Sequence, residues 1–294
     1  MKSGVIGLGD MGSGLAKNLI AAGFETAGFD LDAARMAAFE AMGGRPAASA
    51  ADVGADADVV FVMVMNGAQA RAVFLGEGLA ATMKPGAVVV LTATIKPGEA
   101  RAIGAELDGT GIDMIDSPVS GGFPGAQSGT LTMIAAGADS VLDRAEPAMQ
   151  AVSKTIHRVG AEPGMGQTVK ACLQSLIGSI FSATFEASVL AAKAGVSGQV
   201  LYDVFSTSGA GCGVANTALE NIIDRKFEGT GSGIGTMHKD LTIVMDVARD
   251  LGVPLFTASV AMQWFEAGKT KYPGGDNWIV TRLIEEIVGA QLKR

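Results

Sequence analysis

Lys170 is the residue of this chain whose position most needs a chemical explanation. It is the only charged residue in GMGQTVKACLQSLIGS, residues 164 to 179. Burial of an unpaired ammonium group is costly, so a buried amine gives up its proton more easily. A neutral amine in a dry pocket can accept the proton of an alcohol while hydride leaves the carbinol carbon, and it can return that proton in the reverse reaction. The alternative is a lysine at the exposed edge of a helix, with its ammonium group in water.

A glycine motif near the start of the chain is typical of dinucleotide binding. Gly7, Gly9 and Gly12 have G-x-G-x-x-G spacing, after a predicted strand and at the start of a predicted helix. In this context the glycines allow a pyrophosphate to lie on the N–H groups of the helix terminus. The spacing alone is a weak signal in a chain with 41 glycines. A tight turn without a ligand is the alternative interpretation.

Asp30 ends the second predicted strand, 23 positions after Gly7. An acidic side chain at this point can accept hydrogen bonds from the ribose hydroxyls of adenosine, and it repels a 2′-phosphate. No arginine follows directly, because Arg35 is five residues further on and inside the next predicted helix. We therefore expect NAD to be preferred over NADP, with a simple turn role beside Asp32 as the alternative for Asp30.

Polar residues also follow the later predicted strands. Ligands of open parallel sheets lie beyond the carboxyl ends of the strands, so we expect these residues to face the nicotinamide half of the cofactor. They are Asn66, Gln69, Thr92, Thr94, Ser117 and Ser120. Gly121 and Gly122 follow Ser120, and two adjacent glycines expose successive N–H groups that suit a carboxylate. A flexible turn is the alternative for these two glycines.

The elements that position these residues alternate between strand and helix in the first half of the chain. Apolar runs predict strands over 3–7, 25–30, 58–64, 87–92 and 112–119, and helical patterns predict helices over 11–22, 33–42, 67–75 and 97–107. This alternation predicts a doubly wound parallel sheet, a Rossmann domain, over residues 1–163. The runs at 58 and 87 are continuously apolar, as expected of strands that helices cover on both faces.

The pattern becomes entirely helical after Pro163 and Gly164. One helix of unusual length, within 164–194, connects the two domains, and residues 164–294 form an all-α domain for substrate binding and oligomerisation. The further predicted helices span 198–206, 214–224, 236–250, 254–268 and 276–291.

Composition excludes several classes of protein. The formal charge of −8 argues against a nucleic-acid partner, because phosphates require a basic surface. The apolar stretch 171–194 is interrupted by Gln174, Glu186 and Lys193, so we expect a buried helix and no membrane span. The first ten residues lack the apolar run of a signal peptide.

The few cysteines and histidines predict neither a disulfide framework nor a metal site. Cys172 and Cys212 are the only cysteines and lack metal-binding spacing, as expected in a reducing cytoplasm. His157 and His238 are the only histidines, and neither has a partner at ligand spacing, so we expect no metal.

Four ordered motifs resemble the β-hydroxyacid dehydrogenase family over nearly the whole chain. They are GLGDMG, DSPVSGGFPGAQSGTL, GMGQTVKACLQ and HKDLTIVMDVARDLGVPL. The family includes 3-hydroxyisobutyrate dehydrogenase, tartronate semialdehyde reductase, sulfolactaldehyde reductase and threonate dehydrogenases. The resemblance implies a cytoplasmic, NAD-dependent enzyme that reversibly oxidises a small hydroxy acid of the 3-hydroxyisobutyrate type and forms a homodimer or homotetramer.

The resemblance also implies roles for the matching residues. Lys170 is the expected general acid/base, and Ser120, Gly121, Gly122 and Gln174 are the expected substrate contacts. The expected cofactor contacts are Gly7, Leu8, Gly9, Asp10, Met11, Gly12, Asp30, Val64, Met65, Gln69, Thr94 and Lys239.

Some positions depart from the best-known members. Those carry asparagine one turn after the catalytic lysine, whereas this chain has Gln174, preceded by Leu173. Gln174, VMNGAQ and LTATIKP are similar to the threonate-type branch, and the glycine-rich segment 206–217 replaces a frequent tryptophan. A threonate-type dehydrogenase or a sulfolactaldehyde or tartronate semialdehyde reductase is therefore an alternative. A protein that binds NAD without turnover and a reductase of imines are further alternatives, the last disfavoured by Lys170.

Overall fold

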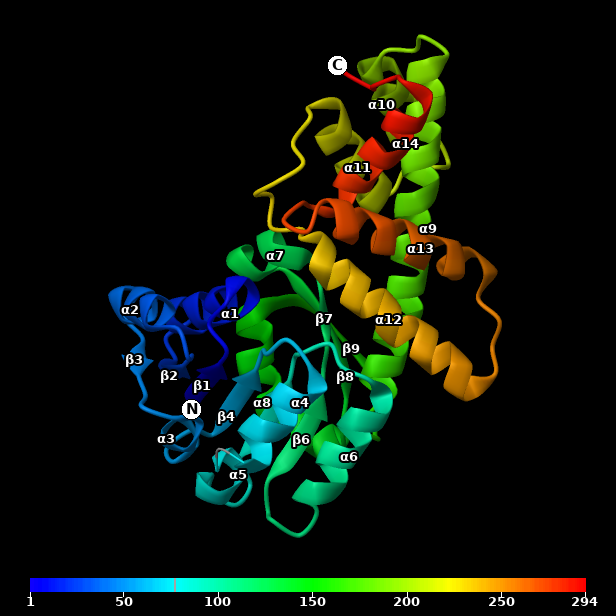
Figure 1. The fold of residues 1–294 in the computed structure, drawn as a ribbon. Coiled ribbons are helices and arrows are strands. Elements are labelled where there is room, and N and C mark those ends of the chain that lie inside the picture. The colour runs from blue at the N-terminus through cyan, green and yellow to red at the C-terminus, as the bar shows by residue number, and fades with distance from the viewer. Residues whose placement is uncertain (77) are drawn as a thin grey trace. The chain divides into compact units, whose positions relative to one another are not determined.

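The computed structural model describes residues 1–76 and 78–294. The chain consists of two compact units, Met1–Lys170 and Ala171–Arg294 (Figure 1). The predicted domain boundary after residue 163 stays a prediction.

Unit 1 is built on one nine-stranded sheet with strand order β3-β2-β1-β4-β5-β6-β8-β7, in which β9 pairs with β8. The strands from β3 to β6 are mutually parallel, which confirms the predicted Rossmann sheet. β8 runs antiparallel to both β6 and β7, and β9 runs parallel to β8. The strands are β1 Lys2–Ile6, β2 Glu25–Phe29, β3 Arg45–Pro46, β4 Val59–Val62, β5 Val88–Leu91, β6 Asp113–Asp116, β7 Val119–Ser120, β8 Leu131–Ala136 and β9 Ser153–Gly160.

Helices cover both faces of the sheet, and this explains the apolar strands. Every residue of β4 (VVFV) and β5 (VVVL) is buried. Val88 and Val90 belong to one core, with helices α1, α2, α7 and α8, whereas Val89 and Leu91 belong to the other, with α3 to α6. The helical segments of this unit are α1 Asp10–Ala21, α2 Ala33–Ala41, α3 Ala50–Gly54, α4 Gly67–Arg71, a π-helical turn Ala72–Gly76, α5 Leu79–Thr82, α6 Pro97–Leu107, α7 Gly122–Ser128 and α8 Asp139–Val152.

Three parts of unit 1 differ from the sequence prediction. The single strand expected over 112–119 is divided into β6 and β7 at Ser117 and Pro118, and proline cannot donate a ladder hydrogen bond. The region 131–160, for which no element was predicted, contains β8, α8 and β9. Short elements β3, α3, α5 and α7 were also not predicted.

Helix α9, Met165–Lys193, begins in unit 1 and continues into unit 2, and it lies within the predicted segment 164–194. By length and composition alone it could cross a membrane, but a core helix of a water-soluble protein meets the same criteria, so this is weak evidence.

The described part of unit 2 is helical, as predicted. Its core contains Phe181, Phe185 and Phe265, and the rings of Phe181 and Phe185 are stacked with centroids 5.9 Å apart. The helix predicted to start at Pro254 begins at Phe256 and ends at Lys271, and the one predicted over 276–291 is a 3₁₀ turn followed by a short helix. The further elements are α10 Gly198–Thr207, α11 Gly213–Ile223, α12 Ile234–Leu251, α13 Phe256–Lys271, the 3₁₀ turn Asn277–Val280 and α14 Thr281–Val288.

Candidate cofactor and substrate site

The glycine motif forms the tight connection between β1 and α1. Gly7 has φ +87°, and a Cβ atom on Gly12 would lie 1.7 Å from the carbonyl oxygen of Gly7. Gly12 therefore allows the first turn of α1 to pack directly on the loop. Gly9 is the N-cap of α1, and no side chain caps the helix there, so its first N–H groups are available to an anion.

Asp30 is fixed next to this loop at the carboxyl end of β2. Its carboxylate accepts hydrogen bonds from the backbone N–H of Leu8 at 2.7 Å and of Asp32 at 2.9 Å. Arg35 Nη1 lies 3.4 Å from Asp30 Oδ2, and the arginine side chain is 51% exposed. Arg35, in the following helix, thus forms an ion pair with the Asp30 carboxylate. The separation of five residues in the sequence did not predict this contact.

The loop after β4 is ordered by its own side chains. Asn66 caps α4 by accepting a hydrogen bond from Gln69 N at 2.9 Å, and Gln69 Oε1 accepts one from Met65 N at 2.9 Å. Val64 is half-buried, and Met65 and Gln69 are exposed, so all three stay predicted cofactor contacts.

Two of the six polar residues expected at the sheet edge lie inside the protein instead. Thr92 is buried and donates a hydrogen bond to the carbonyl of Val62 at 2.9 Å. Ser117 is fully buried. The prediction that these two are polar groups open to a cofactor is therefore wrong, because both side chains are buried. Thr94, in the loop after β5, is half-buried and remains a candidate.

The segment Ser120 to Gly122 joins β7 to α7. Gly121 has φ +128° and Gly122 has φ +58°, two backbone conformations that residues with a Cβ atom rarely adopt. Both glycines are exposed, whereas Ser120 is half-buried and pairs with Thr132 of β8. The conformation is that of a defined turn with accessible backbone.

Lys170 lies in the second turn of α9 and is 6% exposed. A lysine at a wet helix edge is thereby excluded. Gly166 lies one turn earlier on the same helix. A Cβ atom on Gly166 would lie 2.5 Å from the carbonyl oxygen of Asp116 and 2.6 Å from that of Ile134, so the start of the helix packs against strand ends there.

Sequence reasoning missed two residues of unit 1, Asp116 and Gln167. Asp116 is fully buried, and Gln167 Nε2 donates a hydrogen bond to its Oδ1 at 2.8 Å. Burial raises the pKa of the Asp116 carboxyl above its usual value, against the opposing effect of the hydrogen bonds from Gln167 and Gly164. A carboxylate that ends a buried strand is the sequence signal that could have revealed Asp116.

In unit 2, Gln174 and Lys239 share one carboxylate. Gln174 Nε2 donates a hydrogen bond to Asp240 Oδ2 at 2.6 Å. Lys239 Nζ lies 3.0 Å from Asp240 Oδ1, an ion-pair contact without hydrogen-bond alignment. Asp240 is 4% exposed, so α12 holds a buried carboxylate that sequence reasoning did not select.

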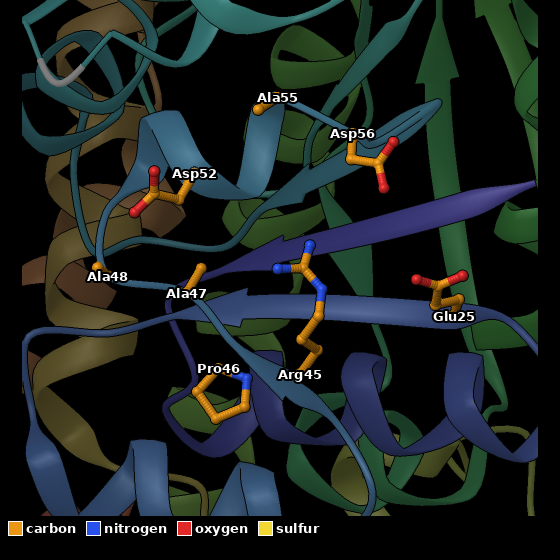
Figure 2. A pocket seen from close by; sticks show the side chains of 8 residues that line it. All are labelled: Glu25, Arg45, Pro46, Ala47, Ala48, Asp52, Ala55 and Asp56. Atoms are coloured by element: carbon orange, nitrogen blue, oxygen red, sulfur yellow. The ribbon is translucent and has the colours of Figure 1, made fainter.

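A hollow of about 540 Å³ lies elsewhere in unit 1 and is unrelated to these residues. Figure 2 shows Arg45 among the carboxylates of Glu25, Asp52 and Asp56. Glu25 and Arg45 are the first residues of their strands, so the hollow lies toward the amino ends, whereas ligands of such sheets bind at the carboxyl ends. Within residues 1–76 and 78–294, no three His, Cys, Asp or Glu side chains are grouped to hold a metal ion.

The Rossmann sheet, the glycine loop and the carboxylate at the end of β2 define a nucleotide-dependent oxidoreductase. Residues 2–160 match the family model described as the NAD binding domain of 6-phosphogluconate dehydrogenase. Residues 164–284 match the model described as NAD-binding of NADP-dependent 3-hydroxyisobutyrate dehydrogenase. The chain belongs to the β-hydroxyacid dehydrogenase family.

Named relatives agree with this assignment. The chain is 38% identical to the L-threonate dehydrogenase of Cupriavidus necator, over 93% of this chain and 92% of that protein. It is 37% identical to the NAD-dependent L-serine dehydrogenase of Pseudomonas aeruginosa, over 97% and 98%. A crystal structure of 3-hydroxyisobutyrate dehydrogenase from Salmonella typhimurium is 34% identical, has a TM-score of 0.88 and covers 96% of this chain and 99% of its own. The protein is thus an NAD(P)-dependent oxidoreductase that acts on the CH–OH group of a hydroxy acid.

Proposed function

We propose that this chain oxidises a small polar hydroxy acid, L-threonate or a close analogue, with NAD as its preferred cofactor and Lys170 as general acid/base. The observation that carries the proposal is the burial of the Lys170 amine in the unit that also contains the glycine loop and Asp30. A buried lysine is costly, and proton transfer at a carbinol oxygen explains its presence.

Each residue has a separate task in this mechanism. The backbone of residues 7–12 binds the cofactor pyrophosphate, and NAD, when bound, supplies the hydride acceptor. Val64, Met65, Gln69 and Thr94 contact its nicotinamide half. The N–H groups of the turn at residues 120–122 bind the substrate carboxylate, and Lys170 takes the hydroxyl proton as hydride departs. Gln174 is a substrate contact and Lys239 a cofactor contact, both still predictions.

The preference for NAD follows from the fixed carboxylate of Asp30. Two backbone hydrogen bonds hold it in place, so it cannot turn away from a 2′-phosphate. Arg35 offers a positive charge to such a phosphate, but its side chain is half-exposed and its 3.4 Å ion pair with Asp30 is worth at most about 1 kcal/mol. We therefore expect the repulsion between the Asp30 carboxylate and a 2′-phosphate to decide the preference. Arg35 lowers the discrimination against NADP only partly.

The choice of substrate rests on relatives and on local sequence. L-threonate dehydrogenases from several bacteria are 34–38% identical over at least 90% of this chain. Gln174 and LTATIKP are similar to that branch, whereas 3-hydroxyisobutyrate is the second candidate because of the solved relative.

The experiment is a substrate screen at alkaline pH that follows NADH absorbance. L-threonate, 3-hydroxyisobutyrate, glycerate, L-serine and 3-hydroxypropionate are compared, each with NAD and with NADP. We expect the highest kcat/KM with L-threonate and NAD. Turnover of none of these acids by the folded protein contradicts the proposal.

Lys170→Ala tests the assigned base. Loss of a general acid/base lowers kcat by about 10²- to 10⁴-fold, while NADH binding persists. Lys154→Ala, at an exposed position of β9, is the matched control and should keep full activity. Small primary amines added to the Lys170→Ala protein should restore part of the rate, because they replace the missing proton acceptor.

We also infer a homodimer or homotetramer in a reducing cytoplasm. Unit 2 exposes large apolar side chains, with Phe256 81%, Ile287 77% and Leu190 73% exposed, and both cysteines are free. Exposed apolar surface of this kind favours association. Light scattering coupled to size-exclusion chromatography measures the mass, and a monomer across micromolar concentrations contradicts the inference.

A further inference from the structure

The carboxylate of Asp116 has more hydrogen bonds than packing requires. Asp116 ends β6, and its Oδ2 accepts from the backbone N–H of Gly164 at 2.8 Å and of Gln167 at 3.2 Å. Its Oδ1 accepts from Gln167 Nε2 at 2.8 Å. These donors all belong to the first turn of α9 or to the residue before it. A buried charge is costly unless it is paired or hydrogen-bonded, so the chain uses this residue for a specific task.

The nitrogen and the oxygen of the Gln167 amide both have partners far away in the sequence. Its Nε2 also donates to the carbonyl of Ala93 at 3.0 Å, and its Oε1 accepts from the N–H of Ile95 at 3.0 Å. The Ala93 carbonyl can only accept, and the Ile95 N–H can only donate. The orientation of the amide is therefore fixed, and an exchange of its oxygen and nitrogen would break both of these hydrogen bonds.

Together the two side chains tie three segments of unit 1 to one another. These are the loop that contains Thr94, the end of β6 that precedes the turn at residues 120–122, and the first turn of α9. Lys170 follows Gln167 by three residues on that rigid helix, which places it one turn further along. A displacement of the first turn of α9 therefore moves the Lys170 amine relative to the Thr94 loop.

We propose that the Asp116–Gln167 pair is a positioning device that sets the Lys170 amine against the Thr94 loop and the turn at residues 120–122. This inference rests on the proposed function of Lys170. Neither Asp116 nor Gln167 contacts the glycine loop or Asp30 through any hydrogen bond of the described residues. Loss of the pair therefore affects the chemical step more than cofactor binding, since a misplacement of about 1 Å can cost 10²-fold in rate.

Gln167→Met and Gln167→Glu test the device in the full-length protein. Methionine keeps the length of the side chain and removes its three hydrogen bonds, but it keeps the backbone N–H that donates to Asp116. Glutamate places a carboxylate against Asp116 and the Ala93 carbonyl. We expect kcat with the best acid of the screen to fall about 10- to 100-fold. The dissociation constant of ADP-ribose, which needs only the glycine loop and Asp30, should stay within about threefold of the parent value in a fluorescence titration.

Asp116→Asn combined with Gln167→Glu provides a conservative rescue. The asparagine amide can donate to the new glutamate, so the pair is reconnected with the same total charge, although the Ala93 carbonyl still faces an oxygen. The double variant should be more active than Gln167→Glu, and the two effects on kcat should not add. Additive losses contradict a paired device.

A purely structural role makes different predictions. Met149→Ala removes a buried side chain from the core beside α8 and serves as the destabilised control. Each protein is assayed below its thermal transition, so that only folded enzyme contributes. If the Gln167 variants lose no more kcat than Met149→Ala, the positioning role is wrong. Full activity of Lys170→Ala contradicts the proposed role of Lys170 as general acid/base. This result differs from the one that contradicts the positioning role, so the experiments distinguish the failure of one proposal from the failure of the other.

Discussion

Alanine at Gly9 and at Gly12 separates the two reasons for a glycine motif, close packing of the chain and close approach of a ligand. A Cβ atom on Gly12 would lie 1.7 Å from the Gly7 carbonyl oxygen, far inside any allowed contact. A Cβ atom on Gly9 meets nothing closer than the flexible Arg35 guanidinium at 3.7 Å. The backbone of Gly9, with φ −66° and ψ −165°, is also open to alanine.

The expected magnitudes follow from these distances. Gly12→Ala requires α1 or the loop to move by more than an ångström, and overpacking of this kind costs about 1–3 kcal/mol or more in unfolding free energy. Gly9→Ala only exchanges a moderately good N-cap residue for a poor one, which costs below about 1 kcal/mol. If a pyrophosphate lies on the loop, however, the methyl group occupies its place. We then expect Gly9→Ala to weaken NADH binding at least tenfold, or about 1.4 kcal/mol.

Urea denaturation and fluorescence titration with NADH and with ADP-ribose measure the two effects separately. Gly12→Ala should lose both stability and affinity, whereas Gly9→Ala should keep stability and lose affinity for both ligands. A Gly9→Ala protein that binds NADH as tightly as the parent would refute a pyrophosphate at this loop and support a tight turn without a ligand.

Three further changes test other parts of the site. Lys170→Arg keeps the positive charge but cannot accept a proton near neutral pH, so kcat should fall about as far as in Lys170→Ala, and activity near the parent level contradicts the base assignment. Asp30→Asn keeps an acceptor for Leu8 N and removes the charge, so the NADP/NAD ratio of kcat/KM should rise at least tenfold, and an unchanged ratio contradicts the ribose assignment. Because burial raises the pKa of Asp116, the folded protein retains this proton to higher pH than the unfolded chain. The contribution of Asp116 to stability is then present below its ordinary pKa of 3.8 and is lost as the pH rises through the raised pKa of the folded protein. In urea denaturation between pH 3 and 7, the parent should therefore lose stability relative to Asp116→Asn as the pH rises. A constant difference in unfolding free energy contradicts a raised pKa.

The sequence predicted the parallel half of the sheet because β4 and β5 are short apolar runs with helical patterns between them. It did not predict the elements over 131–160, for two physical reasons. Helix α8 contains Pro147, a residue that usually ends a helix. Strand β9 is mostly exposed and lacks an apolar run.

The same distinction applies to the site. The glycine loop and Lys170 could be proposed from the sequence because their signals are local, in spacing or in composition. The hydrogen bonds of Gln167 join residues 51 and 74 positions apart, and no local pattern encodes such partners. Thr92 and Ser117 were wrongly expected to be open to a cofactor, because a polar residue that follows a strand can also be buried.

The chemistry of Asp116 indicates why this position holds a carboxylate and not an amide. Burial of this carboxyl raises its pKa and so disfavours its charged form. Electrostatics alone would therefore favour asparagine. Asparagine, however, has a single acceptor oxygen, and its NH₂ group would face the NH₂ group of Gln167. The carboxylate instead accepts from the Gln167 side chain with one oxygen and from the backbone N–H groups of Gly164 and Gln167 with the other. The hydrogen-bond geometry of the helix start thus outweighs the unfavourable charge.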